Sequence, residues 1–152
     1  MPLRDKHPLK RKSIKPSSST VRGMLPVARF RALDAAMQSL RSAGMQLEWH
    51  WRDADIGWVC RGLVDAEVVC ELRPSLTPLI GWLELSADQI KSAKSIKGFP
   101  ASYKKILDFP IHQTTKKSQY EFELESTAER DLFSEMLEAL LPLFESGPDT
   151  QN

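Results

Sequence analysis

Glu48 and His50 are the first residues of the sequence whose types and spacing could do chemistry. They lie in a stretch of alternating polar and apolar residues, which predicts a strand, and positions two apart on a strand share one face. A carboxylate beside an imidazole can orient it as a general base, and Arg61 or Glu71 on a neighbouring strand could join the pair. No nucleophile motif, glycine-rich phosphate loop or HExxH string accompanies them. Because polar residues on the solvent face of an antiparallel sheet need no functional reason, the pattern favours a solvated face over a catalytic site.

A basic segment at the N-terminus is the second candidate. Residues 1–22 carry a net charge of +6, whereas the other 130 residues carry −5. Mobile lysine and arginine side chains neutralise phosphates with little regard to base sequence, so Lys10, Arg11, Lys12 and Lys15 are candidate contacts to nucleic acid or to a partner. The alternative is a solvated, solubilising terminus, which the lack of interleaved aromatic residues favours.

Four tryptophans fall on predicted strands. Trp49 and Trp51 share one face with apolar neighbours, which predicts that both belong to the core. The pattern does not assign Trp58 and Trp82 to a face, and an exposed indole there would stack on a base or another flat ligand. The candidate ligand face therefore consists of Trp58, Trp82, Glu48, His50 and Arg61.

The sequence predicts no metal site and no cofactor. The segment 53–57 opens like a calcium loop, but Trp58 stands at its sixth position, where glycine is needed, and Val64 at its twelfth, where glutamate is needed. Of the other two histidines, His7 lies in the tail and His112 in a loop, so a three-histidine site is not expected. We interpret 53–57 as a hairpin loop.

Cys60 and Cys70 are too few for a disulfide framework or a cysteine-based zinc site. They lie on two consecutive predicted strands. A two-residue turn at Asp65 and Ala66 would put them on opposite faces, whereas a turn longer by one residue would bring them to one face on a diagonal. Free thiols are expected in either case, and they suit a cytoplasmic location.

The elements that position these residues follow from periodicity. Alternation predicts antiparallel neighbours in a meander, because the connections are too short for parallel crossovers. Spacings of three and four predict helices, of which the outer two cover one face of the sheet. Ser86 with Gln89 predicts a capping box at the start of one helix, and Pro142 is expected to end or kink the last. The fold class is α+β, with a five-stranded, mostly antiparallel sheet and the order α-β-β-β-β-α-(α)-β-α. The predicted organisation is a disordered basic tail at 1–23, one α+β domain at 24–146 and a frayed C-terminus at 147–152.

Three short motifs carry a resemblance to a known group of proteins. They are Trp49-His50-Trp51, Gly57-Trp58 and the strand-helix unit from Tyr120 to Leu141. With them, about two-thirds of the chain resembles small bacterial α+β domains of unknown function, of which the YdhG- and YjbR-like domains have a comparable outline. The resemblance implies the fold more than any activity, since these domains lack an agreed set of catalytic residues. The basic tail falls outside it.

Three hypotheses of function remain open. The first is a non-enzymatic binding or regulatory module that engages a protein partner, because nothing assembles into a nucleophile, a base and an oxyanion donor. The second is a nucleic-acid-associated protein that uses the basic tail. The third is an enzyme acting on a small molecule, centred on Glu48 and His50. No apolar run approaches the roughly 18 residues of a membrane-spanning helix, so no membrane partner is predicted.

Overall fold

The computed structural model describes residues 7–17 and 19–145. Within them, six strands form one antiparallel sheet in the order β1-β2-β3-β4-β6-β5. The predicted α+β class and antiparallel sheet are confirmed, and the sheet gains one two-residue strand. The strands are β1 (Gln46–Asp53), β2 (Gly57–Val64), β3 (Glu67–Arg73), β4 (Ile80–Ser86), β5 (His112–Gln113) and β6 (Lys117–Glu123).

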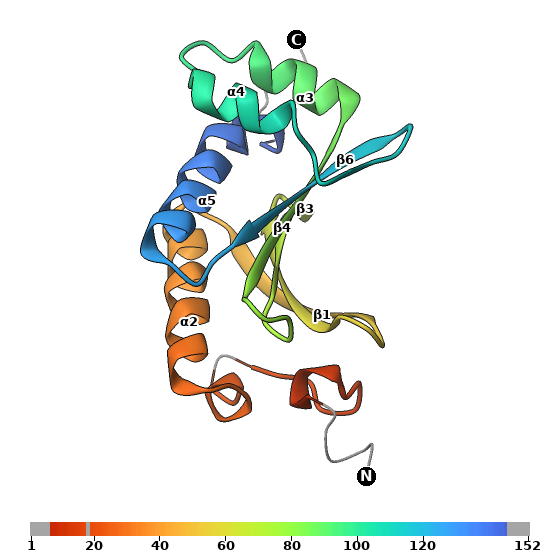
Figure 1. Ribbon diagram of the computed structural model, residues 1–152, viewed down its shortest axis with the longest axis vertical. Coiled ribbons are helices and arrows are strands. Elements are labelled where there is room, and N and C mark those ends of the chain that lie inside the picture. The colour runs from red at the N-terminus through yellow and green to blue at the C-terminus, as the bar shows by residue number, and fades with distance from the viewer. Residues whose placement is uncertain (1–6, 18, 146–152) are drawn as a thin grey trace.

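Helices cover one face of this sheet. In Figure 1 the two longest, α2 (Val27–Ser42) and α5 (Thr127–Leu140), lie on the same side of the strands. The shorter α3 (Ala87–Lys94) and α4 (Ala101–Leu107) lie together beyond one end of the sheet. Three 3-10 turns complete the described structure: η1 (Pro8–Lys10), η2 (Val21–Met24) and η3 (Leu141–Leu143).

The helix ends follow local sequence signals. The Ser86 side chain accepts a hydrogen bond from the Gln89 N–H, and the Gln89 side chain accepts one from the Ser86 N–H, so the predicted capping box starts α3. The Ser126 hydroxyl likewise accepts from the Glu129 N–H at the start of α5. Pro142 was expected to end the last helix, and α5 indeed gives way to η3 one residue after Leu140.

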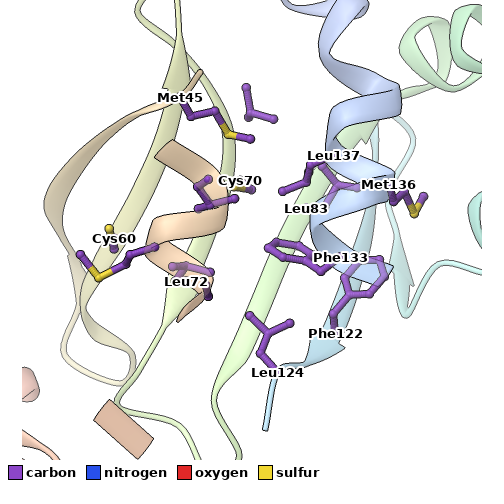
Figure 2. Packing of buried hydrophobic residues seen from close by; sticks show 14 of the residues in the cluster. Met45, Cys60, Cys70, Leu72, Leu83, Phe122, Leu124, Phe133, Met136 and Leu137 are labelled. Atoms are coloured by element: carbon purple, nitrogen blue, oxygen red, sulfur yellow. The ribbon is translucent and has the colours of Figure 1, made fainter. Parts of the chain in front are cut away.

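The hydrophobic core lies between the sheet and α5. Figure 2 shows Leu83 of β4 and Phe122 of β6 pointing towards Phe133 and Leu137 of the helix. The rings of Phe122 and Phe133 are 5.0 Å apart between centroids. A Cβ added at Gly81 would lie only 2.9 Å from the Phe133 ring, so this glycine allows the helix to approach β4 closely.

The described part of the N-terminal tail is packed on the domain, which corrects the expectation of a disordered segment for residues 7–17 and 19–23. Leu9 is fully buried and Val21 is 1% exposed, and both belong to the core cluster. The Trp58 Nε1–H donates to the Arg11 carbonyl over 3.0 Å. The low apolar content of the tail did not predict this docking, because two isolated apolar side chains, Leu9 and Val21, are enough to anchor a short polar segment. Residues 1–6 of the predicted tail and 147–152 of the predicted C-terminus lie outside the described residues.

The β2–β3 hairpin decides the placement of the cysteines. Asp65 and Ala66 form the predicted two-residue turn, with φ of 52° and 67°. A bulge after Gly62 then shifts the register by one residue, so that Gly62 lies opposite Cys70. Cys60 and Cys70 therefore share the helix-covered face, and both are free thiols. The bulge therefore brings both cysteines to one face, as a turn longer by one residue would have done.

Candidate binding site on the open sheet face

A row of mostly charged side chains crosses five strands on the face of the sheet opposite to α2 and α5. Cross-strand neighbours share a face, and one continuous row of such neighbours crosses the sheet from β1 to β6. The row consists of Glu48, Arg61, Glu71, Trp82 and Glu121. The strand alternation that buries apolar side chains under the helices therefore gathers charged ones here, on what we term the open face.

Three arginines surround one buried glutamate at the centre of this face. The Glu71 carboxylate is 3.0 Å from Arg52 Nη1, 3.5 Å from Arg61 Nε and 3.2 Å from Arg73 Nη2. Glu71 is 5% exposed, and so is Arg73. Each arginine comes from a different strand, β1, β2 or β3, and one carboxylate neutralises only one of the three positive charges. Arg52 Nη2 also lies 3.8 Å from Glu84, an ion pair too long for a hydrogen bond.

Arg73 is held between its carboxylate and an indole ring. Its guanidinium lies 3.9 Å from the centroid of Trp82, a short cation–π distance, while the Trp82 Nε1–H donates to Glu84 over 3.0 Å. Burial lowers the pKa of Arg73 below its ordinary value, and the Glu71 carboxylate opposes that shift. A guanidinium nevertheless stays charged at neutral pH. Arg73 therefore adds a fixed positive charge under the site.

A shallow depression of about 200 Å³ opens over this cluster. Its lining includes two of the three arginines, two carboxylates and an exposed lysine, with the indole on one side. The residues that matter here are Arg52, Arg61, Glu71, Trp82, Glu84 and Lys117. Within the described part of the chain, the buried Arg61 Nε and Arg73 Nη2 lie near Glu71 but make no hydrogen bond of good geometry. Both atoms are enclosed and ion-paired with Glu71, and the Nε–H of Arg73 donates to the same carboxylate over 3.2 Å.

The predicted acid–base pair is not assembled. Glu48 is exposed and makes no ion pair or hydrogen bond with any described residue, although it lies opposite Arg61, whose guanidinium turns to Glu71. His50 makes no hydrogen bond with Glu48 in the same part of the chain. Partial burial, followed by the charge of Arg61, lowers the pKa of His50, while Glu71 and Glu48 oppose that shift. Neither Glu48 nor His50 lines the depression.

The structure places Trp58 and Trp82 on different faces of the sheet. Trp58 is 8% exposed and lies on the helix-covered face, where its ring meets Trp51 edge-on at 5.7 Å, so its prediction as a ligand platform is wrong. The physical reason is the docked tail, whose Arg11 carbonyl accepts the indole N–H. Trp82 does lie on the open face, but Arg73 already stacks on its ring. Trp49 and Trp51 are half-buried against the core, as predicted.

The basic tail and the depression are not brought together. The tail reaches the sheet through Trp58, whose side chain lies on the helix-covered face, whereas Arg61 of the same strand points to the open face. Arg11, Lys12 and Lys15 are exposed, and Lys10 is half-buried. The two sets of predicted contact residues therefore belong to separate surfaces.

Sequence reasoning included Arg61 in the site but missed Arg52, Arg73, Glu84 and Lys117. Arg52 directly precedes the predicted hairpin loop at 53–57, and neither Arg52 nor Arg73 was among the candidate residues. The signal that could have found them is alternation carried one residue further along each strand, since Arg52 follows Glu48 and His50 at spacings of two and Arg73 follows Glu71.

No match was found when the chain was compared with models of known protein families, with curated protein sequences and with solved structures. The resemblance to YdhG- and YjbR-like domains therefore stays a prediction. Among residues 7–17 and 19–145, no group of three or more histidine, cysteine or acidic side chains is placed to hold a metal ion. The helices in these ranges are all too short or too polar to cross a bilayer.

Proposed function

We propose that this protein is a non-enzymatic binding module whose open face binds an acidic segment of a protein partner. The observation that carries the proposal is the arrangement of Arg52, Arg61 and Arg73 around the single carboxylate of Glu71. Glu84, 3.8 Å from Arg52, is the second carboxylate of the cluster, so three arginines meet two carboxylates and positive charge stays in excess at the centre of a face that no described helix covers. An acidic side chain would neutralise part of that excess, and guanidinium groups bind carboxylates through paired N–H donors.

The shape of the site supports a peptide side chain better than a small-molecule substrate. Pockets for drug-sized ligands enclose about 300–1,000 Å³. The depression here measures about 200 Å³ and lies on a sheet surface. That space suits a carboxylate of one side chain, with the rest of the partner lying across the strands.

The flanks of the face set the expected charge pattern of the partner. Glu48 and Glu121 are exposed at the two ends of the row that has Glu71 at its centre. Like charges placed opposite each other are unfavourable, so a long polyacidic segment would be repelled at these ends. A segment with one or two central acidic residues and basic residues on either side fits the row.

The proposal is tested with a fluorescein-labelled peptide that has two central glutamates flanked by lysine and serine. A peptide with glutamine in place of both glutamates is the ligand control. Fluorescence anisotropy is expected to show binding of the glutamate peptide and at least tenfold weaker binding of the glutamine peptide. A hydrogen bond to a charged group contributes about 1.5–3 kcal/mol, which corresponds to a factor of ten or more in Kd.

Arg61→Gln is the informative variant, because Arg61 is only partly buried and two arginines remain beside Glu71. Arg31→Gln is the matched control, since Arg31 is an exposed arginine on α2 and does not line the depression. We expect Arg61→Gln to weaken binding of the glutamate peptide at least tenfold and Arg31→Gln to leave it unchanged. Equal affinities for the two peptides, or equal behaviour of the two variants, would contradict the proposal.

A second candidate is sequence-independent binding of nucleic acid by the tail. The observation in its favour is that Arg11, Lys12 and Lys15 are exposed on a segment anchored by the buried Leu9. Anisotropy of a fluorescein-labelled oligonucleotide would then show binding that weakens steeply with salt. Replacing Lys12 and Lys15 by glutamate is expected to abolish it, whereas the same change at the exposed Lys104 and Lys105 of α4 would not. Equal loss in both double variants would contradict a specific role of the tail.

A further inference from the structure

The outer edge of β1 has no strand neighbour among residues 7–17 and 19–145. This strand is eight residues long, and its only partner among the described strands is β2, which leaves one row of its backbone groups without a strand neighbour. None of its residues is buried, whereas most residues of β2 are. An edge strand of this length is a template for pairing with another chain, and proteins normally shorten, cover or charge such edges.

We propose that β1 pairs antiparallel with β1 of a second copy of this chain, around a two-fold axis at His50. The reason is the order of residues Glu48-Trp49-His50-Trp51-Arg52. When this segment is laid antiparallel on itself with His50 opposite His50, each Glu48 faces an Arg52 and each Trp49 faces a Trp51. The segment is thus complementary to itself in both charge and side-chain type, as a two-fold interface requires.

The open-face side of this pairing joins unlike charges. Glu48 is exposed and forms no ion pair with the described residues of its own chain. Arg52 donates to Glu71 through Nη1, which leaves other N–H donors of its guanidinium. The Arg52 of one copy can therefore keep its hydrogen bond to Glu71 and donate another to Glu48 of the second copy. Opposite charges directly across an antiparallel pair stabilise it.

The other side of the pairing joins aromatic rings. Leu47, Trp49 and Trp51 lie half-buried on this side, packed against the core. Trp51 already meets Trp58 edge-on at 5.7 Å. The second copy would place its own Trp49 beside that Trp51, so the partly exposed rings at the edge would be covered. Aromatic cross-strand pairs are among the more favourable pairs in sheets.

Other registers lose this complementarity. With the two-fold axis at Trp49, Glu48 would lie opposite His50, and Arg52 opposite Gln46. With the axis at Trp51, Glu48 would lie opposite Ala54, which is outside β1. The strand is regular from Gln46 to Trp51, and the bulge at Arg52 ends the regular stretch. On a His50 axis the regular residues Trp49, His50 and Trp51 pair with one another, and the two Glu48–Arg52 pairs lie at the ends of this stretch, where the bulge begins.

Cysteine cross-linking tests the register directly. In the proposed pair, residue 50 faces its own copy with Cα atoms about 4.5–5.5 Å apart, within the range of a disulfide. His50→Cys is therefore expected to give a disulfide-linked dimer on mild oxidation, seen on a non-reducing gel. Glu48→Cys is the matched control, because its two copies would be four residues apart along the strand, or about 13 Å, and would stay unlinked. The native Cys60 and Cys70 are buried and do not contribute.

The mass in solution gives the second readout. Light scattering after gel filtration, at chain concentrations up to about 100 µM so that micromolar association is detected, is expected to give twice the 17.2 kDa of one chain. Glu48→Arg would place like charges opposite Arg52 and should give the monomer mass. Glu121→Arg, the same change at an exposed position of β6, should leave the dimer intact.

A monomer mass for the native chain at every concentration would overturn the proposal. So would a dimer that survives Glu48→Arg, or equal cross-linking at positions 48 and 50. The two proposals share Arg52, so their readouts are kept apart: mass and cross-linking test the dimer, whereas Arg61→Gln, at a residue of β2 outside the proposed β1 pair, tests peptide binding.

Discussion

The two faces of the sheet differ in the side chains that lie over them. On the helix-covered face, Phe133, Leu137 and the other apolar side chains of α5 pack on β4 and β6 and exclude water. On the open face, Val59 and Ile80 are equally buried, although neither belongs to the core cluster. Long charged side chains such as Arg52 and Arg61 lie on this face, and an arginine stem can rest on apolar surface while its charged end stays free. The comparison shows that one face of the sheet is packed by apolar helix side chains while the other carries a network of ion pairs.

The largest loss of stability is expected when the carboxylate of Glu71 is removed from the open face. Glu71→Gln removes the negative charge that contacts three arginines and leaves their guanidinium groups close together and partly buried. Breaking a buried ion pair by removing one partner costs about 3–5 kcal/mol. We expect a loss of about that size in the free energy of unfolding, measured by urea denaturation. Glu84→Gln, at a half-exposed position of the same face, should cost less than about 1 kcal/mol. Equal losses in the two variants would show that the charge of Glu71 has no special role.

A smaller effect is expected where the covered face depends on close packing. Gly81→Ala places a Cβ 2.9 Å from the buried Phe133 ring and 3.0 Å from Leu124, so the ring or the helix must move. Overpacking of this kind costs about 1–3 kcal/mol. Thermal unfolding of the variant should show the loss. Gly23→Ala, where a Cβ meets nothing within 4 Å, is the control and should change stability little. An unchanged melting temperature for Gly81→Ala would mean that α5 can shift away without cost.

A loss of stability at alkaline pH is expected from the helix-covered face, because both cysteine thiols lie on that face. Burial raises the pKa of Cys60 to about 12 and raises the pKa of Cys70 as well. Above pH 9 the unfolded chain loses these protons while the folded protein keeps them, so stability falls as pH rises through the ordinary thiol pKa. The slope is about 1.4 kcal/mol per pH unit for each thiol. Urea denaturation between pH 8 and 10, run in parallel on the double variant Cys60→Ala/Cys70→Ala, should show the slope in the native chain and a much flatter curve in the variant.

The smallest effect concerns the turn that sets which residues face which side. Ala66 has a φ of 67°, in the left-handed region that favours glycine, and follows Asp65 at 52°. Ala66→Gly would convert the turn to Asp-Gly, a preferred pair for a two-residue hairpin loop, and should stabilise the protein by about 0.5–1 kcal/mol. A higher urea midpoint with unchanged slope would confirm it. The same substitution at the exposed Ala35 in the middle of α2 should instead destabilise by about 1 kcal/mol.

Much of the architecture could be predicted because it depends on neighbouring residues. Alternation at Glu48 and His50 placed both on one face of a strand, and the short connections between strands required antiparallel neighbours. The capping signal at Ser86 and the proline at 142 marked helix ends correctly. These features follow from the sequence alone, since each is decided by backbone geometry over a few residues.

The site and the tail depended on contacts between residues far apart in the chain. Arg52 of β1 meets Glu71 of β3 across the intervening β2, and Leu9 enters a core built by residues that follow it, so no local pattern predicted either contact. The bulge after Gly62 changed the register by one residue and thereby moved Cys70 to the face of Cys60. A shift of one residue reverses the side on which every later side chain of a strand lies. The sequence by itself determined the elements and their polar and apolar sides, and the tertiary structure decided which of those sides meet.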